Sequence, residues 1–237
     1  MNLLMSLFIS TSLAATAVPL NAMADASSLV LAESIELNVS TEGGSASGGK
    51  GQMPARQSLS GGGSNVIDVP FYSQFADISS AKWQKLGCGI TSLAMIIELY
   101  RPGIVAVNKL LKEGINAGAF INGAGWSHKG LALLAENYGL KGANYDLSGS
   151  DMKTAFAQLE KILKEGPVIA SVHYKLDPKN PIPHLIVVNG INNGQVYYND
   201  PASAMGGKNI SIQKFMKAWK KRYITARPET KKLLVKS

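Results

Sequence analysis

The segment that most limits the fold is the run CGITSLAMIIELY, residues 88–100. Apolar residues occur on nearly every side of a helix formed by this run, and Arg101-Pro102-Gly103 stops such a helix. A helix that is apolar nearly all round must be covered by other elements, so we expect it at the centre of a domain. It begins at Cys88, the only cysteine of the chain. Any fold therefore has to bury this helix with its single thiol at one end.

The segments around this helix predict an α+β domain. The sequence VIDVPFYSQ, from Val66, is expected to be extended, because the residue before a proline avoids the helical conformation. Two more helices are expected over 127–139, with Ser127 as the cap, and over 151–164. The segments VIASVHY, HLIVVNG and QVYYN then predict strands, and a short helix from Ile212 and a strand RYITA complete the domain. Helices that precede an antiparallel sheet indicate an α+β fold.

The residues before this domain predict export and a linker. An early apolar run ends in Ala22-Met23-Ala24, a small-x-small pattern typical of a cleavage site. We therefore predict a signal peptide over 1–24 and a periplasmic or extracellular location, although the first basic residue is only Lys50. Residues 25–64 are rich in Ser, Gly and Ala and bury too little apolar surface to order themselves, so we interpret them as a flexible linker. The folded domain then occupies 65–237.

Positive charge is concentrated near the end of the chain. The formal net charge is +8, and the basic residues of the last stretch are Lys214, Lys217, Lys220, Lys221, Arg222, Arg227, Lys231, Lys232 and Lys236. We interpret this cluster as a solvated helix face followed by a basic C-terminal tail, a candidate for weak contact with an anionic surface. No aromatic residues alternate with the basic ones in a recognition motif, so a nucleic-acid partner is not expected.

The composition favours no cofactor and no metal. A single cysteine excludes an internal disulfide and a multi-cysteine zinc site. The three histidines, His128, His173 and His184, do not have metal-ligand spacing. No GxxxxGK[ST] loop and no strand-linked GxGxxG loop is present to bind phosphate. Any chemistry must come from cysteine, histidine and carboxylate side chains.

Cys88 is the candidate nucleophile. A thiol attacks a carbonyl well only as thiolate, and proteins favour the thiolate by placing the cysteine at a helix N-terminus beside a histidine. Cys88 begins the central helix between Gly87 and Gly89, and small neighbours let a substrate backbone approach. An inert, buried cysteine is the alternative, since cysteine is often a core residue.

His184 and Asp200 are the candidate partners of this thiol. His184 begins one expected strand and Asp200 ends the next. If residues 190–194 form a five-residue loop, His184 lies directly opposite Asp200, as a base held by an orienting carboxylate requires. A two-residue turn at 193–194 instead places Asp200 opposite Val187, so the site depends on the register.

The remaining histidines and two glutamines complete the candidate set. His173 has no acidic partner close in sequence, and His128 falls in the first turn of a helix, where the dipole disfavours a cation. We interpret both as structural. A developing oxyanion needs a donor besides the Cys88 N–H, and Gln74 or Gln84 can supply it by position.

These motifs together resemble a known family. The sequences DVPFYSQ, CGITSLAM, GWSHKGLALLAENYGL, HLIVVNG and YYNDP are similar to those of the bacteriocin-processing, double-glycine cysteine peptidases. The resemblance covers about 66–227 and implies a papain-like fold, with a central N-terminal helix packed on an antiparallel β-sheet. It implies Cys88 as nucleophile, His184 as base, Asp200 as orienting residue and Gln74 as oxyanion-hole residue. Unlike transporter-linked members, this chain is expected to be free-standing.

The function that follows is hydrolysis of a peptide bond by an exported thiol peptidase. Its partner would be a peptide or protein substrate, attacked through a Cys-His-Asp triad and a thioester. The alternative is a catalytically silent papain-like module that binds a peptide or a cell-envelope partner. The substrate and the oligomeric state stay open.

Overall fold

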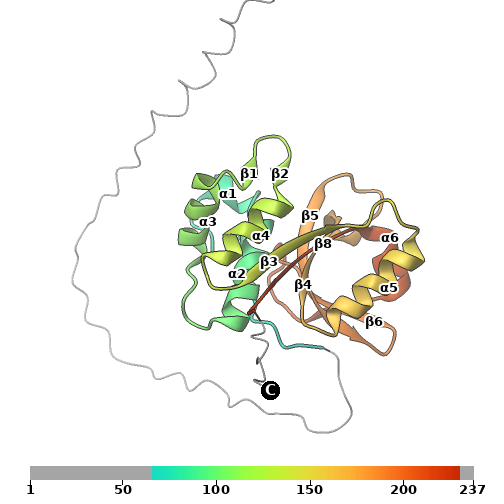
Figure 1. Ribbon diagram of the computed structural model, residues 1–237. Helices are drawn as coiled ribbons and strands as arrows, with labels where there is room; N and C mark the ends of the chain where they lie inside the picture. The colour runs from blue at the N-terminus through green and yellow to red at the C-terminus, as the bar shows by residue number, and fades with distance from the viewer. Residues whose placement is uncertain (1–65, 230–237) are drawn as a thin grey trace, which may run out of the picture. The chain divides into compact units, whose positions relative to one another are not determined.

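A computed structural model describes residues 66–229, which form an α+β domain (Figure 1). Within these residues six strands make one sheet in the order β3-β8-β4-β5-β6-β7, and each neighbouring pair is antiparallel. The strands of this sheet are β3 (Lys141–Asp146), β4 (Val168–His173), β5 (Pro183–Asn192), β6 (Gln195–Asn199), β7 (Lys208–Ser211) and β8 (Trp219–Arg227). A separate hairpin pairs β1 (Phe120–Ile121) with β2 (Gly125–Trp126).

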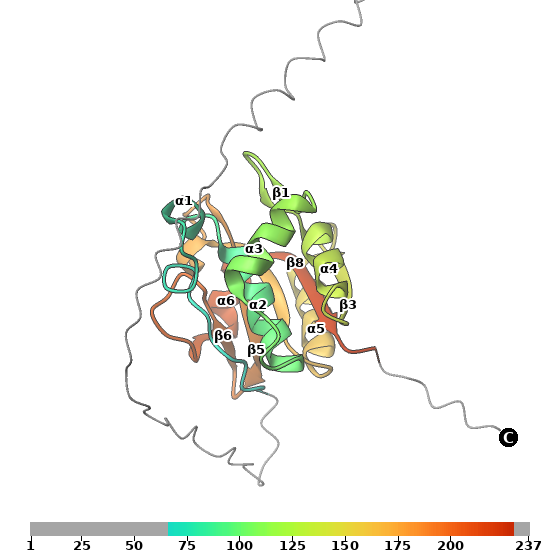
Figure 2. The ribbon, with the colours of Figure 1, turned by 90° about the vertical axis from the view of Figure 1, so that its left-hand side faces the viewer.

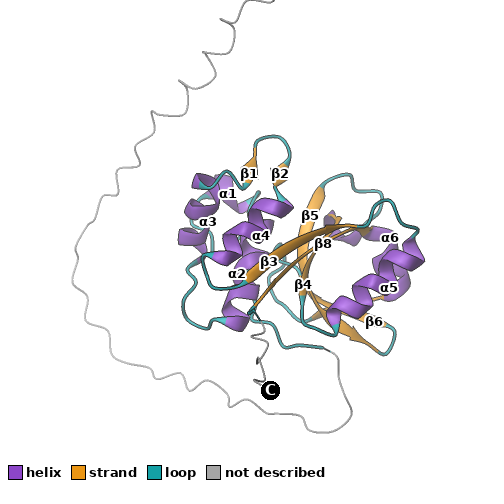
Figure 3. Cartoon of the chain, in the orientation of Figure 1, coloured by secondary structure: helices purple, strands orange, loops and turns teal. Residues whose placement is uncertain are grey.

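Helices cover both faces of the sheet (Figures 2 and 3). They are α1 (Ala81–Gln84), α2 (Cys88–Tyr100), α3 (Val107–Asn116), α4 (His128–Glu136), α5 (Met152–Leu163) and α6 (Ile212–Ala218), and η1 (Tyr174–Leu176) is a 3₁₀ turn. On β5, Leu185 and Val187 pack in a core with α2, α3 and α4, whereas Ile186 and Val188 pack in a second core with α5 and α6. Successive strand residues point to opposite faces, so β5 is buried on both.

The central helix is confirmed as α2. It spans Cys88–Tyr100, the limits expected from the sequence, and its residues from Gly89 to Ile97 are buried. Only glycine fits at position 89, because the ring of Trp126 lies within 2.9 Å of where a Cβ atom of Gly89 would stand. The helix that carries the thiol is therefore enclosed on all sides along most of its length.

The helices expected over 127–139 and 151–164 are also confirmed, as α4 and α5, whereas α3 was not predicted. The Ser127 side chain accepts a hydrogen bond from the Gly130 N–H at the start of α4. The Asp151 side chain accepts a hydrogen bond from the Thr154 N–H at the start of α5. Each cap satisfies a backbone donor that the helix itself leaves unpaired. The α+β prediction is thus confirmed by helices and sheet alike.

Three parts of the sheet differ from expectation, and the first is β7, a strand that was not predicted. β3 was not predicted, because KGANYD is polar and mostly exposed, as suits an edge strand, and shows no apolar alternation. β8 begins at Trp219, so Lys220, Lys221 and Arg222 belong to the sheet. The interpretation of these three residues as a solvated helix face and tail is wrong.

The hairpin between β5 and β6 corrects the expected register. Asn193 and Gly194 form a two-residue turn, and both have positive φ, 47° and 72°, as a type I′ turn requires. The favoured five-residue loop is therefore wrong. The pairing next to the turn is the one that a two-residue turn gives. It shifts by one residue at a bulge between Val188 and Gly190.

Several predictions concern residues outside 66–229. The signal peptide over 1–24, the linker over 25–64 and the basic residues beyond Glu229 lie outside the described residues and stay predictions. Within 66–229 no helix has the length and apolar character to cross a membrane.

Candidate active site

The thiol and the imidazole come together where the start of α2 meets the start of β5. The Cys88 side chain lies beside the His184 ring. The two elements are tied one turn further along α2, where Ser92 Oγ donates to the Leu185 carbonyl oxygen at 3.2 Å. Cys88 and His184 both line one cleft of about 480 Å³. A substrate that enters this cleft meets both side chains.

Asp200 holds the other side of the same ring. His184 Nε2 lies 2.7 Å from Asp200 Oδ1, which also accepts from the Ala202 N–H at 2.9 Å. Because Nε2 faces the carboxylate, Nδ1 is the nitrogen left for the thiol. The three residues that the sequence singled out are therefore linked in the order Cys88, His184, Asp200.

The bulge explains how this contact forms in an unexpected register. Without the bulge, the pairing seen next to the turn would continue along both strands. Asp200 would then lie opposite Val187, on the other face of the sheet from His184. With the extra residue Asn189, the register continues to place Asp200 opposite Ile186. Ile186 and His184 are two residues apart and share a face, so Asp200 is a diagonal neighbour of His184 and within side-chain reach.

His184 and Asp200 are both charged at neutral pH. Burial is the largest influence on the His184 ring and lowers its pKa, but the hydrogen bonds from Asp200 and Cys88 outweigh burial and raise the pKa to about 9. Burial also disfavours the Asp200 carboxylate, yet the His184 hydrogen bond and positive charge hold the pKa of Asp200 below its ordinary value.

Backbone contacts fix the loop that carries Asp200. The Gln74 N–H donates to the Pro201 carbonyl at 2.8 Å, which joins the first described segment to this loop. Asn199 is 1% exposed, and its amide donates to the Val69 carbonyl at 2.9 Å and accepts from the Gly207 N–H at 2.8 Å. The residue before the carboxylate is thus buried, and both its amide nitrogen and its amide oxygen have partners.

The two candidate glutamines have different surroundings. Gln84 uses both N–H groups of its amide, on the carbonyls of Phe75 at 3.1 Å and Ile78 at 2.9 Å. Gln74 is 3% exposed and packs against Gly87, and its Nε2 donates to the Gln84 carbonyl at 2.7 Å. A primary amide has two N–H donors, so only Gln74 keeps one unused. Neither glutamine is among the residues that line the cleft.

Aromatic rings form one wall of the cleft. Phe120 and Trp126 from the small hairpin line it beside Leu86, whose carbonyl accepts from Trp126 Nε1 at 2.6 Å. The rings of Phe120 and Trp126 meet edge to face at 5.2 Å. Gly123 in the turn of this hairpin and Gly125 at the start of β2 both have positive φ and line the cleft as well. This wall can accept an apolar or backbone-rich part of a ligand.

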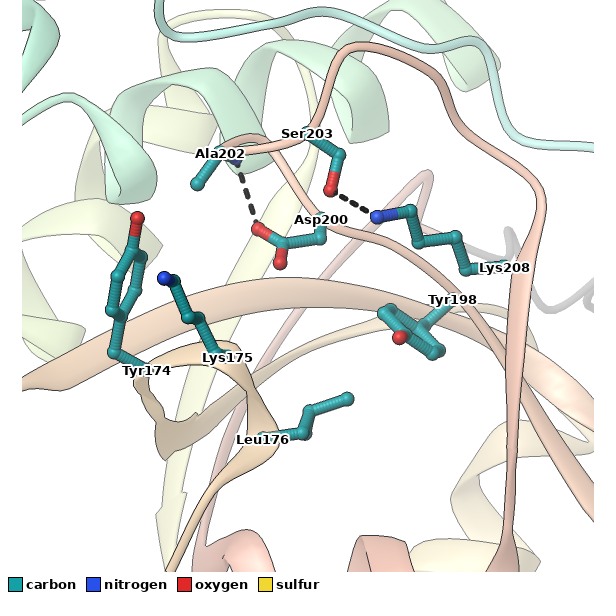
Figure 4. Close-up of a pocket in the computed structure, with 8 residues that line it drawn as sticks. All are labelled: Tyr174, Lys175, Leu176, Tyr198, Asp200, Ala202, Ser203 and Lys208. Carbon is teal, nitrogen blue, oxygen red and sulfur yellow. Dashed lines mark hydrogen bonds between the residues drawn. The ribbon is translucent and has the colours of Figure 1, made fainter. Parts of the chain in front are cut away.

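Asp200 also lines a second cavity, of about 330 Å³ (Figure 4). Tyr174 and Lys175 approach it from η1, Ser203 from the loop after β6, and Lys208 from the start of β7. Lys208 Nζ donates to Ser203 Oγ at 2.6 Å. The Tyr174 ring meets the His184 ring edge to face at 5.1 Å, so one lining residue of this cavity contacts the catalytic candidate.

The other two histidines are separate from the pair. His173 Nδ1 lies 2.7 Å from the Asn180 carbonyl, a contact within its own loop. His128 lines the cleft, and burial, then the positive charge of Arg222, lowers its pKa, so this ring is neutral at neutral pH. The sequence interpretation did not place His128, Lys220 or Arg222 at the site. No local motif marks them, because α4 carries His128 and β8 carries the other two, and these elements are far apart in the sequence.

No group of three or more histidine, cysteine, aspartate or glutamate side chains within 66–229 could hold a metal ion. The site described above therefore consists of a thiol, an imidazole and a carboxylate, with a partly aromatic cleft in front of the thiol.

Comparison with known proteins places this domain in a family. Among solved structures it is similar to a putative C39-like peptidase from Bacillus anthracis, at 20% identity and TM-score 0.51, over 70% of this chain and 98% of that one. It is also similar to a double glycine motif protease from an AMS/PCAT transporter, solved in complex with the leader peptide. The identity is 24% and the TM-score 0.49, over 69% of this chain and 94% of that one. A third similar structure is the peptidase domain of Streptococcus ComA, at 21% identity and TM-score 0.47, over 61% of this chain and 93% of that one.

The first of these likenesses supports the fold. No match was found among curated proteins. The family model described as "Peptidase_C39 like family" matches residues 66–227, which is more than half of the chain and nearly all of the described domain. The chain belongs to the Peptidase_C39-like family.

Proposed function

We propose that this protein is a thiol peptidase in which Cys88 is the nucleophile, His184 the acid–base residue and Asp200 the residue that positions the ring. The observation that carries the proposal is the 2.7 Å contact between His184 Nε2 and Asp200 Oδ1, on a ring that lines the same cleft as Cys88. A structural role for Cys88 needs neither a protonated partner nor an open cleft. A peptidase needs both.

The chemical steps follow from these positions. The Cys88 thiolate attacks the carbonyl carbon of a peptide bond, and the protonated His184 gives its proton to the leaving amine as the C–N bond breaks. The acyl group then remains on sulfur as a thioester. Neutral His184 accepts a proton from a water molecule, which attacks the thioester and releases the acid. Asp200 keeps the ring oriented throughout both steps.

Two donors are proposed for the oxyanion. The first is the Cys88 N–H, since the first N–H groups of a helix have no partner within the helix. The second is the unused N–H of Gln74, which packs behind Gly87. Such donors stabilise the charge that develops on the carbonyl oxygen. Gln84 does not fit this role, because both its N–H groups already bind backbone carbonyls.

The proposed place of action is outside the cytoplasm. The support is the apolar run that ends in Ala22-Met23-Ala24, because no described residue bears on export. Sequencing the N-terminus of the protein recovered from cell fractions tests this part separately. An exported form that begins near Asp25 is the expected result.

The peptidase proposal is tested with a peptide library. The purified chain and its Cys88→Ala variant are each incubated with mixed peptides, and products are identified by mass spectrometry. Cleavage that requires Cys88 is expected. If the chain binds peptides but cuts none, the silent binding module is correct instead, and the nucleophile assignment fails.

A further inference from the structure

The catalytic cleft carries positive charge that the proposed reaction does not use. Three basic side chains line it, Lys85 before α2 and Lys220 and Arg222 on β8, and we call them the basic rim. No aspartate or glutamate is among the residues that line this cleft in the described part of the chain. The protonated His184 would offset a negative charge on the Cys88 sulfur. The cleft is therefore cationic overall.

Members of the basic rim differ in how much of their charge is already paired. Arg222 Nε lies 2.8 Å from Asp146 Oδ2, so part of its charge is satisfied. Within 66–229 neither Lys85 nor Lys220 has a carboxylate at ion-pair distance. Lys220 is also half-buried, whereas Lys85 is exposed. A half-buried, unpaired ammonium is the strongest anion-attracting group of the three.

A distortion of β8 places Lys220 in this position. Ser171 of β4 pairs with Arg222, but the next residue, Val172, pairs with Trp219. Lys220 and Lys221 are thus extra residues in a bulge, and bulges next to active sites re-aim side chains.

Lys221 shows how the bulge is held. It has a φ of 57°, which is unusual for a residue with a side chain. Its Nζ atom donates to the carbonyls of Ser148 at 2.8 Å and Ser150 at 2.6 Å. One lysine of the bulge is therefore anchored to the loop after β3, and the other lines the cleft beside Ser171.

We propose that the basic rim, with Lys220 as its main member, binds an acidic side chain of the peptide substrate, so that the enzyme prefers aspartate or glutamate near the scissile bond. The inference rests on the proposed function for its substrate, but the anion site itself can be tested without one. The aromatic wall of the cleft fits the backbone and apolar parts of such a peptide. The basic rim binds the carboxylate of the acidic side chain.

The test uses Cys88 as its own reporter. Iodoacetate and iodoacetamide both alkylate the thiolate with loss of iodide, and they differ in that iodoacetate carries a negative charge. The ratio of their two rate constants, measured by mass spectrometry, cancels changes in thiol reactivity. Because the chain has one cysteine, every added mass reports Cys88. Lys220→Gln is expected to lower the iodoacetate to iodoacetamide ratio by about threefold or more.

Two control variants exclude other causes. Lys220→Arg keeps the charge and should keep most of the ratio. Lys153→Gln removes the same charge from the exposed surface of α5, away from the cleft lining, and should leave the ratio unchanged. An unchanged ratio in Lys220→Gln, with an unaltered circular dichroism spectrum, overturns the proposal. So does an equal fall in Lys153→Gln.

Matched peptides separate this inference from the proposed function. For a peptide that the enzyme cleaves, the glutamate and glutamine versions of each position near the cut are compared by kcat/KM. A glutamate preference that Lys220→Gln removes is expected. Cleavage without any acidic preference overturns the inference and leaves the peptidase function standing. If no peptide is cleaved while the alkylation ratio still falls in Lys220→Gln, the peptidase function fails and the anion site stands.

Discussion

The helix side and the hairpin side of the site are built in different ways. On the helix side, Cys88 is held by α2, whose limits and burial follow from an apolar pattern within one segment. On the hairpin side, His184 and Asp200 meet only because one extra residue, Asn189, shifts the pairing of β5 and β6. A nucleophile fixed by local pattern therefore works with a base and a carboxylate fixed by strand register. The two sides are open to different kinds of damage.

The largest effect is expected where the two sides meet. Cys88→Ala and His184→Ala should each lower kcat by about 10⁴-fold or more, and the double variant should lose little beyond either one, because the members of a catalytic pair act as a unit. Initial rates on the best library peptide measure this. Additive losses would mean that the thiol and the ring act independently.

The fold was largely predictable because most of its elements have local signals. The apolar run of α2, the caps Ser127 and Asp151 and the strand segments from VIASVHY onward each act within a few residues. β3 was missed because an exposed edge strand needs no apolar alternation. The sequence singled out Cys88, His184 and Asp200 as candidates, and the structure brings His184 to Asp200 and places Cys88 in the same cleft as His184.

The parts of the site that were not predictable depend on pairing between distant segments. The bulge at Asn189 has no sequence mark, yet without it Asp200 would fall on the wrong face. The bulge at Lys220 likewise depends on where β8 pairs with β4, so a residue that reads as part of a basic tail lines the cleft. A one-residue shift of register reverses every side chain beyond it, and local patterns do not encode such a shift.

The next effect concerns the two glutamines beside the thiol. Gln74→Ala should lower kcat by about a hundred- to a thousandfold, the typical loss of one oxyanion donor, while the melting temperature changes little. Gln84→Ala should show the opposite pattern, because its amide holds the carbonyls of Phe75 and Ile78. Kinetics and thermal melts of both variants give the comparison. A slow Gln84→Ala enzyme with normal Gln74→Ala turnover would assign the donor to the other residue.

A smaller effect is expected from the carboxylate. Asp200→Asn should lower kcat by about tenfold, since the amide can still orient the ring but no longer stabilises its charge. The wild-type pH profile should lose activity as the pH rises through about 9, where His184 releases its proton. The Asn variant should lose activity at a lower pH, because it lacks an interaction that raises this pKa. An alkaline limb at the same pH in both enzymes would contradict the assignment.

Stability should follow the same titration. The pKa of His184 is raised in the folded protein from 6.5 to about 9, so the stabilisation from its charge is complete below pH 6.5 and disappears as the pH rises through 9. The free energy of unfolding, measured with urea, should therefore fall over this range in the wild type. The fall should be smaller in Asp200→Asn.

The smallest effect concerns the hydrogen bond that joins the two sides. Ser92→Ala removes the donor to the Leu185 carbonyl, a buried bond of 3.2 Å between α2 and β5, and should cost about 1 kcal/mol of unfolding free energy. Its neighbour Thr91 offers a matched control. Thr91 is also fully buried, but its Oγ1 atom has no partner within the described residues.

Thr91→Val keeps the shape of that side chain and removes only the unpaired hydroxyl, so stability should stay equal or rise. Activity provides the sharper distinction. Loosening the contact between α2 and β5 shifts Cys88 relative to His184, so Ser92→Ala should lower kcat by a few fold while Thr91→Val leaves kcat unchanged. Equal stability and equal kcat in the two variants would show that packing of apolar side chains, not this hydrogen bond, sets the distance between the nucleophile and its base.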